Sequence, residues 1–118
     1  MRKAEIVYTV AMAKHCIPCE ISAASMLAKE ISFRLPALPG WRAENNHHLI
    51  KDFKFSDFKS ALEFVNKVGS LAEEEGHHPD IELAWGKVTI KLFTHSISGL
   101  SENDFLMAEF IEALANKN

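Results

Sequence analysis

The feature that most constrains the fold is a long apolar stripe between residues 56 and 75. Apolar side chains recur there at the three- and four-residue spacing of one helix face. They are Phe58, Ala61, Leu62, Val65, Val68, Leu71 and Ala72. Ser56 or Asp57 can cap the start of this helix, and Gly76 stands where a left-handed residue commonly ends one. The stripe therefore predicts an amphipathic helix that must bury one face against other elements.

Shorter patterns on either side of this helix predict two pairs of strands. Residues 41–44 and 49–55 flank Asn45-Asn46-His47-His48, a hairpin connection in which asparagine tolerates positive φ. Residues 81–84 and 87–94 form a second pair about Trp85-Gly86. Alternate positions in both pairs place apolar residues on one face, which predicts burial on one side of a sheet.

Two more helices complete the pattern. One is expected over residues 22–33, before Pro36 and Pro39-Gly40 interrupt the chain. The other is expected from Ser101 through about residue 115, where Ser101 and Asp104 have the spacing of a capping box. The order helix, two strands, helix, two strands, helix predicts an α+β fold: a four-stranded antiparallel sheet with three helices packed on one face.

A chain of 118 residues has room for one core. Residues 1–20 lack clear periodicity and are interpreted as an N-terminal extension, followed by one domain over residues 21–118. The net charge of −3 argues against nucleic acid as a partner, and no apolar run approaches the roughly 20 residues that span a membrane. Glu5 and the missing cleavage pattern argue against a secretory signal, so we expect a cytoplasmic protein.

The only two cysteines, Cys16 and Cys19, stand in a Cys-x-x-Cys spacing. One such pair is half of a structural zinc site, and its flanks do not show the strand–helix context of a redox motif. We expect two thiols with no chemical role, with shared metal binding or a disulfide as the alternatives.

Three of the six histidines, with acids at both ends, suggest a functional site. His77-His78-Pro79 follows the acidic run Glu73-Glu74-Glu75 and Gly76, while His95 and Asp104 come later. Histidine changes charge between pH 5 and 8, and a carboxylate partner raises its basicity. Glu73, one helical turn before His77, could orient an imidazole. The pattern favours proton transfer, in which one histidine gives a proton to a leaving hydroxyl and another takes a proton from an adjacent nitrogen.

Each of these residues also has a purely structural interpretation. A histidine doublet can cap a helix C-terminus, His95 can be a buried strand residue, and Asp104 can be the third residue of a helix. The acidic run can be a solvated face, and His47-His48 are interpreted as turn residues. A zinc site of His77, His78 and His95 is disfavoured because adjacent ligands form an awkward tetrahedral pair.

Taken together, Glu73, His77-His78-Pro79, Trp85, His95 and Asp104 resemble the signature of the pterin-4a-carbinolamine dehydratases. Similar segments extend the resemblance from about residue 22 to the C-terminus: Leu38-Pro39-Gly40-Trp41, Phe53-Lys54-Phe55-Ser56-Asp57-Phe58, Thr94-His95 and Gly99-Leu100-Ser101.

The resemblance implies a homodimer or homotetramer that dehydrates 4a-hydroxytetrahydropterin to the quinonoid dihydropterin in tetrahydrobiopterin recycling, without metal or organic cofactor. It implies that His77, His78 and His95 are the site histidines and that Asp104 and Glu73 orient them. It also implies that Trp41, Pro79, Thr94 and Ser96 line the pterin pocket. Which histidine is the acid and which the base stays open.

Two other functions stay open at this point. Members of the family are also known as dimerisation cofactors of a homeodomain transcription factor, which implies a protein-binding module as the first alternative. A dehydratase-like protein of molybdopterin metabolism is the second. Cys16-Ile17-Pro18-Cys19-Glu20 is similar to a segment of some members, but Ile21-Ser22 replaces the Gly-Gly that often follows it.

Overall fold

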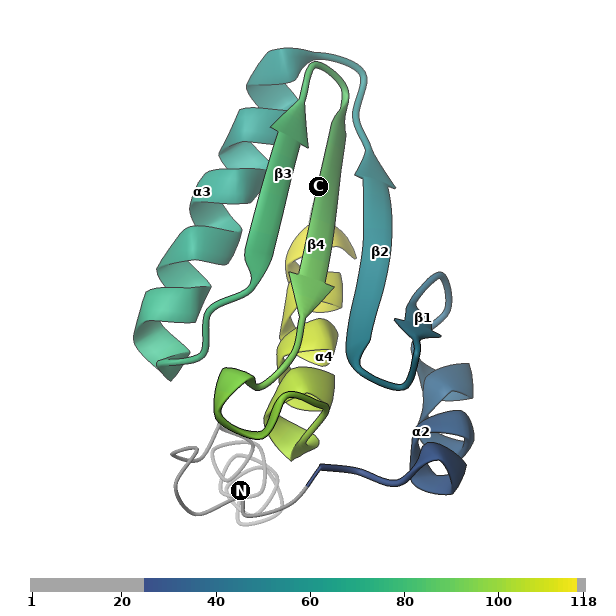
Figure 1. Ribbon diagram of the computed structural model, residues 1–118. Helices are drawn as coiled ribbons and strands as arrows, with labels where there is room; N and C mark the ends of the chain where they lie inside the picture. Colours follow the sequence, from purple (N-terminus) through teal and green to yellow (C-terminus); the bar gives the residue numbers. More distant parts are fainter. Residues whose placement is uncertain (1–24, 117–118) are drawn as a thin grey trace, which may run out of the picture.

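The computed structural model describes residues 25–116 of the chain (Figure 1). Its elements follow the predicted order of helices and paired strands, with a 3₁₀ turn after the first helix and another after the last strand. They are α2 (Ala28–Arg34), η1 (Leu35–Ala37), β1 (Arg42–Glu44), β2 (His48–Lys54), α3 (Phe58–Glu75), β3 (Asp80–Ala84), β4 (Lys87–Leu92), η2 (His95–Ile97) and α4 (Glu102–Asn116). The α+β class is confirmed, whereas the predicted extension and both cysteines lie outside the described residues.

The four strands form one antiparallel sheet in the order β1-β2-β4-β3. The β1–β2 hairpin turns at Asn45 and Asn46, whose φ angles of 55° and 53° are positive as predicted. In the register of β2 with β4, Leu49 lies opposite Leu92. The residues just before β2 therefore run beside those just after β4.

Helices α3 and α4 lie behind the sheet, and α2 lies beside β1 (Figure 1). The alternation of β4 buries every second side chain, which places Val88, Ile90 and Leu92 at 0% exposure in the core. A bidentate pair between Arg34 and Glu102 ties α2 to the first residue of α4. Among residues 25–116, no helix is long and apolar enough to cross a membrane.

The buried stripe of α3 is centred differently from the predicted one. Ala61, Phe64, Val68 and Ala72 are buried, while Phe58 and Leu62 stay 44% and 39% exposed. Phe64 lies three residues after Ala61 and four before Val68, so it shares their face. Its ring packs against the rings of Phe53 and Phe55 on the sheet side. The helix itself, its Asp57 cap and its left-handed Gly76 are as predicted.

The first helix begins later than predicted. Residues 22–24 lie outside the described part of the chain, and the helix starts at Ala28 after an extended Leu27. Met26 donates its backbone N–H to the carbonyl of Leu100 at 2.7 Å. This long-range bond holds the segment extended, although its sequence has helical periodicity.

Candidate active site

Three chain segments that carry the predicted site residues meet at one end of the sheet. The turn after α3, the loop after β4 and the start of α4 all lie at the lower end of the molecule in Figure 1. Hydrogen bonds join residues of these segments directly.

Gly76 sets the direction of the chain that carries the histidine pair. Its φ of +69° is left-handed, a conformation that costs a residue with a side chain more than it costs glycine. The N–H groups of Gly76 and His77 both donate to the carbonyl of Ala72, at 2.9 and 3.3 Å. This cap closes the helix and turns His77 back toward the molecule, where its side chain is 6% exposed.

His77 meets Asp104 in a buried polar network. Nε2 of His77 donates to Oδ1 of Asp104 at 2.6 Å, and the carboxylate is 0% exposed. Oδ2 accepts from the hydroxyl of Thr94 at 2.8 Å and from the backbone N–H of Ser101 at 3.0 Å. Since Thr94 gives its only proton to Asp104, the hydroxyl of Ser101 donates to Thr94 across 2.7 Å.

This network satisfies a buried carboxylate with three donors, which is the condition for burying a charge. It also determines which ring nitrogen of His77 carries the proton. Because Nε2 carries the proton given to Asp104, Nδ1 of the neutral ring is left as the basic nitrogen. The bond from Ser101 to Asp104 is one half of the predicted capping box, so Asp104 serves the helix and the imidazole together.

His78 has its own carboxylate. Nε2 of His78 lies 2.6 Å from Oε2 of Glu73, and both side chains are exposed, at 59% and 80%. Glu73 is thus paired with His78, although sequence spacing pointed toward His77; the left-handed turn at Gly76 carries His77 to the other side. An exposed pair of this kind stabilises the fold little, so its effect is on the orientation of His78. Pro79 follows, half-buried, before β3 begins.

His95 lies beyond the end of β4 and not within it. The strand ends at Leu92, Thr94 forms a single bridge with Gly99, and His95 begins the 3₁₀ turn. His95 and Ser96 are both exposed. Gly99 is closely packed on Ser25, because a Cβ on Gly99 would lie 2.8 Å from the side chain of Ser25. The imidazole of His95 packs on the ring of Phe93, with centroids 4.2 Å apart.

Thr94 is a buried member of the network, but Trp41 has different partners. Its ring is 5% exposed, packs edge-on against Phe53 and donates its indole N–H to Glu112 of α4 at 2.9 Å. Lys51 contacts the same carboxylate at 2.5 Å. The structure therefore brings His77, Thr94 and Asp104 into direct contact and places Trp41 in the core beside α4.

One residue near the site was interpreted as a turn residue in the sequence. The ring of His47 lies 4.6 Å from that of Phe93, which in turn contacts His95. The pattern of residue types gave no sign of this contact. The pairing of β2 with β4 could have revealed it, because it places the residues before Leu49 next to those after Leu92.

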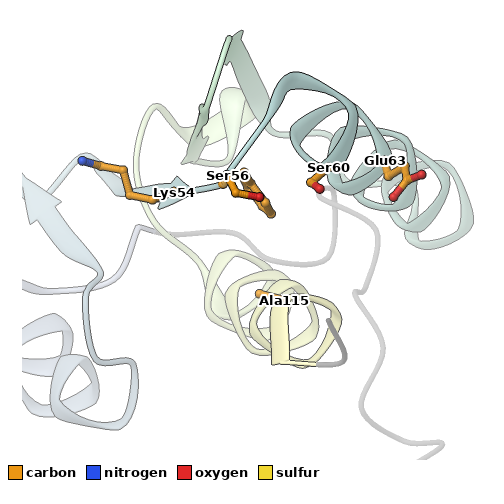
Figure 2. A pocket seen from close by; sticks show the side chains of 6 residues that line it. Lys54, Ser56, Ser60, Glu63 and Ala115 are labelled. Carbon is orange, nitrogen blue, oxygen red and sulfur yellow. The ribbon is translucent and has the colours of Figure 1, made fainter.

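A hollow of about 340 Å³ lies elsewhere, where β2 leads into α3 beside the end of α4 (Figure 2). It is lined by Lys54, Phe55, Ser56, Ser60, Glu63 and Ala115. None of the predicted site residues lines this hollow. Within residues 25–116, no group of three or more histidine, cysteine or acidic side chains is arranged to hold a metal ion.

Comparison with known proteins decides the family. The family model described as pterin 4 alpha carbinolamine dehydratase matches residues 24–114, most of the chain and all of the elements that form the site. The chain belongs to this family. The resemblance carried by the sequence motifs is thereby confirmed.

Individual relatives of the pterin 4 alpha carbinolamine dehydratase family agree. A protein of Alkaliphilus metalliredigens named "Putative pterin-4-alpha-carbinolamine dehydratase" is 49% identical over 100 residues, which cover 84% of this chain and 90% of that one. A protein of the same name from Rubrobacter xylanophilus is 45% identical, covering 86% and 94% of the two chains.

Two solved structures share the fold. The crystal structure of a "transcriptional coactivator/pterin dehydratase" from Brucella melitensis has a TM-score of 0.73 and 34% identity, covering 77% of this chain and 98% of that one. A "pterin dehydratase-like protein" described as a RuBisCO assembly factor in the alpha-carboxysome has a TM-score of 0.57 and 29% identity. It is covered over 89% of its length and covers 64% of this chain.

Proposed function

We propose that this protein is a hydro-lyase that dehydrates 4a-hydroxytetrahydrobiopterin to the quinonoid dihydropterin by histidine acid–base catalysis, in tetrahydrobiopterin recycling. The observation that carries the proposal is the pair of adjacent imidazoles, each held through Nε2 by a different carboxylate. His77 is held by Asp104 and His78 by Glu73, at 2.6 Å in both cases. This arrangement leaves Nδ1 of each ring for the substrate.

The reaction requires two balanced proton transfers. One imidazolium gives a proton to the hydroxyl on C4a, the C4a–O bond breaks, and water leaves. A neutral imidazole takes the proton from N5, and the electron pair of that N–H bond forms the double bond between N5 and C4a. Each positioned acid or base can contribute roughly 10²- to 10⁴-fold. The proposal needs neither a metal ion nor an organic cofactor for this chemistry.

The remaining predicted residues shape the site in this proposal. His95 is the third catalytic histidine, exposed at the start of η2. Pro79, Thr94 and Ser96 are proposed to line the space for the bicyclic ring, whereas the burial of Trp41 beside Glu112 of α4 argues against the same role for Trp41. Thr94 acts from behind, because its hydroxyl is buried and bonded to Asp104.

Histidine replacement tests the proposal. Purified protein should speed the loss of the 4a-hydroxy adduct, followed by pterin absorbance, and His77→Ala, His78→Ala and His95→Ala should each reduce kcat roughly 10²-fold or more. His15→Gln is the matched control, because it removes a histidine outside the family match at residues 24–114. A His78→Ala protein that keeps the full rate would overturn the proposed site.

A protein-binding role is the second candidate. It is favoured by two apolar residues left exposed on α3, Phe58 and Leu62. It is also favoured by the descriptions of the two solved relatives as a transcriptional coactivator and as an assembly factor. A partner retained in stoichiometric amount by a His78→Ala protein, and lost in a Phe58→Ser/Leu62→Ser protein, would support this role. If both variants retain the partner, the surface formed by Phe58 and Leu62 is not the binding site.

The proposal also includes a homodimer or homotetramer in the cytoplasm. Light scattering on purified protein tests the assembly, and fractionation of cells that express the protein tests the compartment. The rival pathway, molybdopterin metabolism, is tested by gene neighbourhood. An aromatic amino acid hydroxylase gene beside this one supports pterin recycling, and molybdenum cofactor genes support the rival.

A further inference from the structure

Four ring side chains lie in a row beside the candidate active site. Phe93 and His95 follow β4, His47 belongs to the β1–β2 turn, and His48 is the first residue of β2. Ring centroids are 4.2 Å apart for His95 and Phe93, 4.6 Å for Phe93 and His47, and 5.3 Å for His47 and His48. The first two contacts are tilted, with interplanar angles of 46° and 39°. Spacings near these values are typical of favourable aromatic pairs. The row thus runs from the third site histidine to the β1–β2 hairpin.

Backbone geometry fixes the end of the row that lies at the β1–β2 hairpin. The hairpin turns through Asn45 and Asn46, both left-handed, and closes with a 2.9 Å hydrogen bond from the N–H of His47 to the carbonyl of Glu44. The antiparallel pairing of β2 with β4 then sets His47 beside Phe93. Both residues are half-buried, whereas His95 is exposed.

Polar contacts hold the last two rings of the row, His47 and His48. Nδ1 of His47 lies 3.1 Å from Nδ1 of His48, and Nε2 of His48 lies 3.4 Å from the carboxylate of Glu44. Burial, and then the nearby charge of Lys91, lower the pKa of His48, which favours the neutral form of its ring. A neutral His48 that directs its Nε2–H toward Glu44 must accept at Nδ1, so His47 donates there. The plane of the His47 ring is thereby fixed.

The three site histidines are held in different ways. His77 and His78 each bond a carboxylate, whereas the side chain of His95 packs, within residues 25–116, on the ring of Phe93. We propose that Phe93 and His47 are positioning residues for His95, in which Phe93 supports the imidazole and His47 fixes Phe93. The catalytic part of this inference rests on the proposed function. The structural part, that these rings orient His95, does not.

The first readout is the proton chemical shifts of the His95 ring in the free protein, measured by NMR. The ring current of Phe93 displaces these shifts, so Phe93→Leu should move them toward those of a freely exposed histidine. Phe93→Tyr keeps a ring and should preserve them, and His47→Gln should move them less, in the same direction as Phe93→Leu. Phe33→Leu is the control, because Phe33 is 82% exposed on α2.

The second readout is the dehydration rate. Phe93→Leu should lower kcat roughly 2- to 10-fold, the loss expected from one aromatic contact, with KM little changed, and Phe93→Tyr should restore kcat. If His47 acts through Phe93, the double variant Phe93→Leu/His47→Gln should be no slower than Phe93→Leu alone.

Two results would overturn the inference: His95 ring shifts that are the same in wild type and Phe93→Leu, or effects of the two substitutions that simply add. If Phe93→Leu fails to fold, unchanged His95 shifts in His47→Gln overturn it equally. A wild-type protein without dehydratase activity would contradict the proposed function, while the NMR experiment would still decide whether the rings position His95.

Discussion

Asp104 accepts a 2.6 Å hydrogen bond from Nε2 of His77 in a site where the carboxylate has no contact with solvent. The two residues are 27 positions apart and come from different helix ends. Because the same carboxylate also binds Thr94 and the N–H of Ser101, the start of α4 and the imidazole share one acceptor. We therefore expect stability and catalysis to be coupled at this residue.

Asp104→Asn tests that coupling. An amide presents one acceptor where three donors converge, so a buried donor is left unsatisfied and the free energy of unfolding should fall by about 1–3 kcal/mol. The rate should fall at least about 10-fold, because His77 loses the partner that fixes its proton on Nε2. Urea unfolding and the dehydration assay measure the two effects. A stable variant with wild-type rate would contradict the coupling.

The hydroxyl of Thr94, just after β4, can be compared with the hydroxyl of Thr89 within β4. Thr94→Val removes a buried donor to Asp104 and should lower the free energy of unfolding by about 1–3 kcal/mol. Thr89→Val removes a similar 2.7 Å bond to Asp52 on the open face of the sheet, where water can replace it. Urea unfolding should therefore separate the two variants, and equal losses would show that burial of the network is unimportant.

Gly76 and Gly69 test the turn that carries the histidines. Gly76→Ala meets no atom within 4 Å, so its cost is the left-handed conformation, about 1–2 kcal/mol of unfolding free energy. Gly69 lies inside α3, also with open space, and Gly69→Ala should stabilise the protein by about 0.5–1 kcal/mol. Chemical denaturation measures both changes. A Gly76→Ala protein as stable as wild type would mean that the cap is not needed.

The lowered pKa of His48 has a predictable effect on stability. The unfolded chain binds a proton near the usual histidine value of about 6.5, whereas burial and Lys91 delay protonation of the folded form to lower pH. The folded state therefore loses stability as the pH falls from about 6.5 toward the pKa of folded His48. His48→Gln should weaken this loss. An NMR titration in which His48 ionises at or above the usual value would contradict the prediction.

Much of the fold was predictable because local patterns agree with tertiary structure. The period of α3, its Asp57 cap, the left-handed Gly76 and the alternation in β4 each depend on near neighbours. The predicted start of α2 was wrong, because the backbone bond from Met26 to Leu100 joins residues far apart in the sequence and local periodicity cannot predict it. The predicted stripe omitted Phe64, because the periodicity does not determine where the centre of a broad apolar helix face lies.

The residues of the candidate site could be predicted from the sequence, but their hydrogen-bond and ring partners could not. Spacing brought Glu73 near the histidine doublet, yet only the turn at Gly76 decides that it binds His78. His47 was not distinguished from other turn residues, since its contact with Phe93 depends on strand register. Trp41 donates to Glu112, 71 positions later in the chain, and no local sequence pattern predicts that bond.

If His77, His78 and His95 surround a single pterin site, a ligand titration followed by NMR of the histidine rings will detect it. A non-reacting dihydropterin should shift the ring resonances of all three histidines with one common Kd. The indole signal of Trp85, in the β3–β4 turn at the opposite end of the sheet (Figure 1), should stay unchanged. Saturable binding that leaves these histidines unmoved, or shifts them with unrelated affinities, would contradict the account.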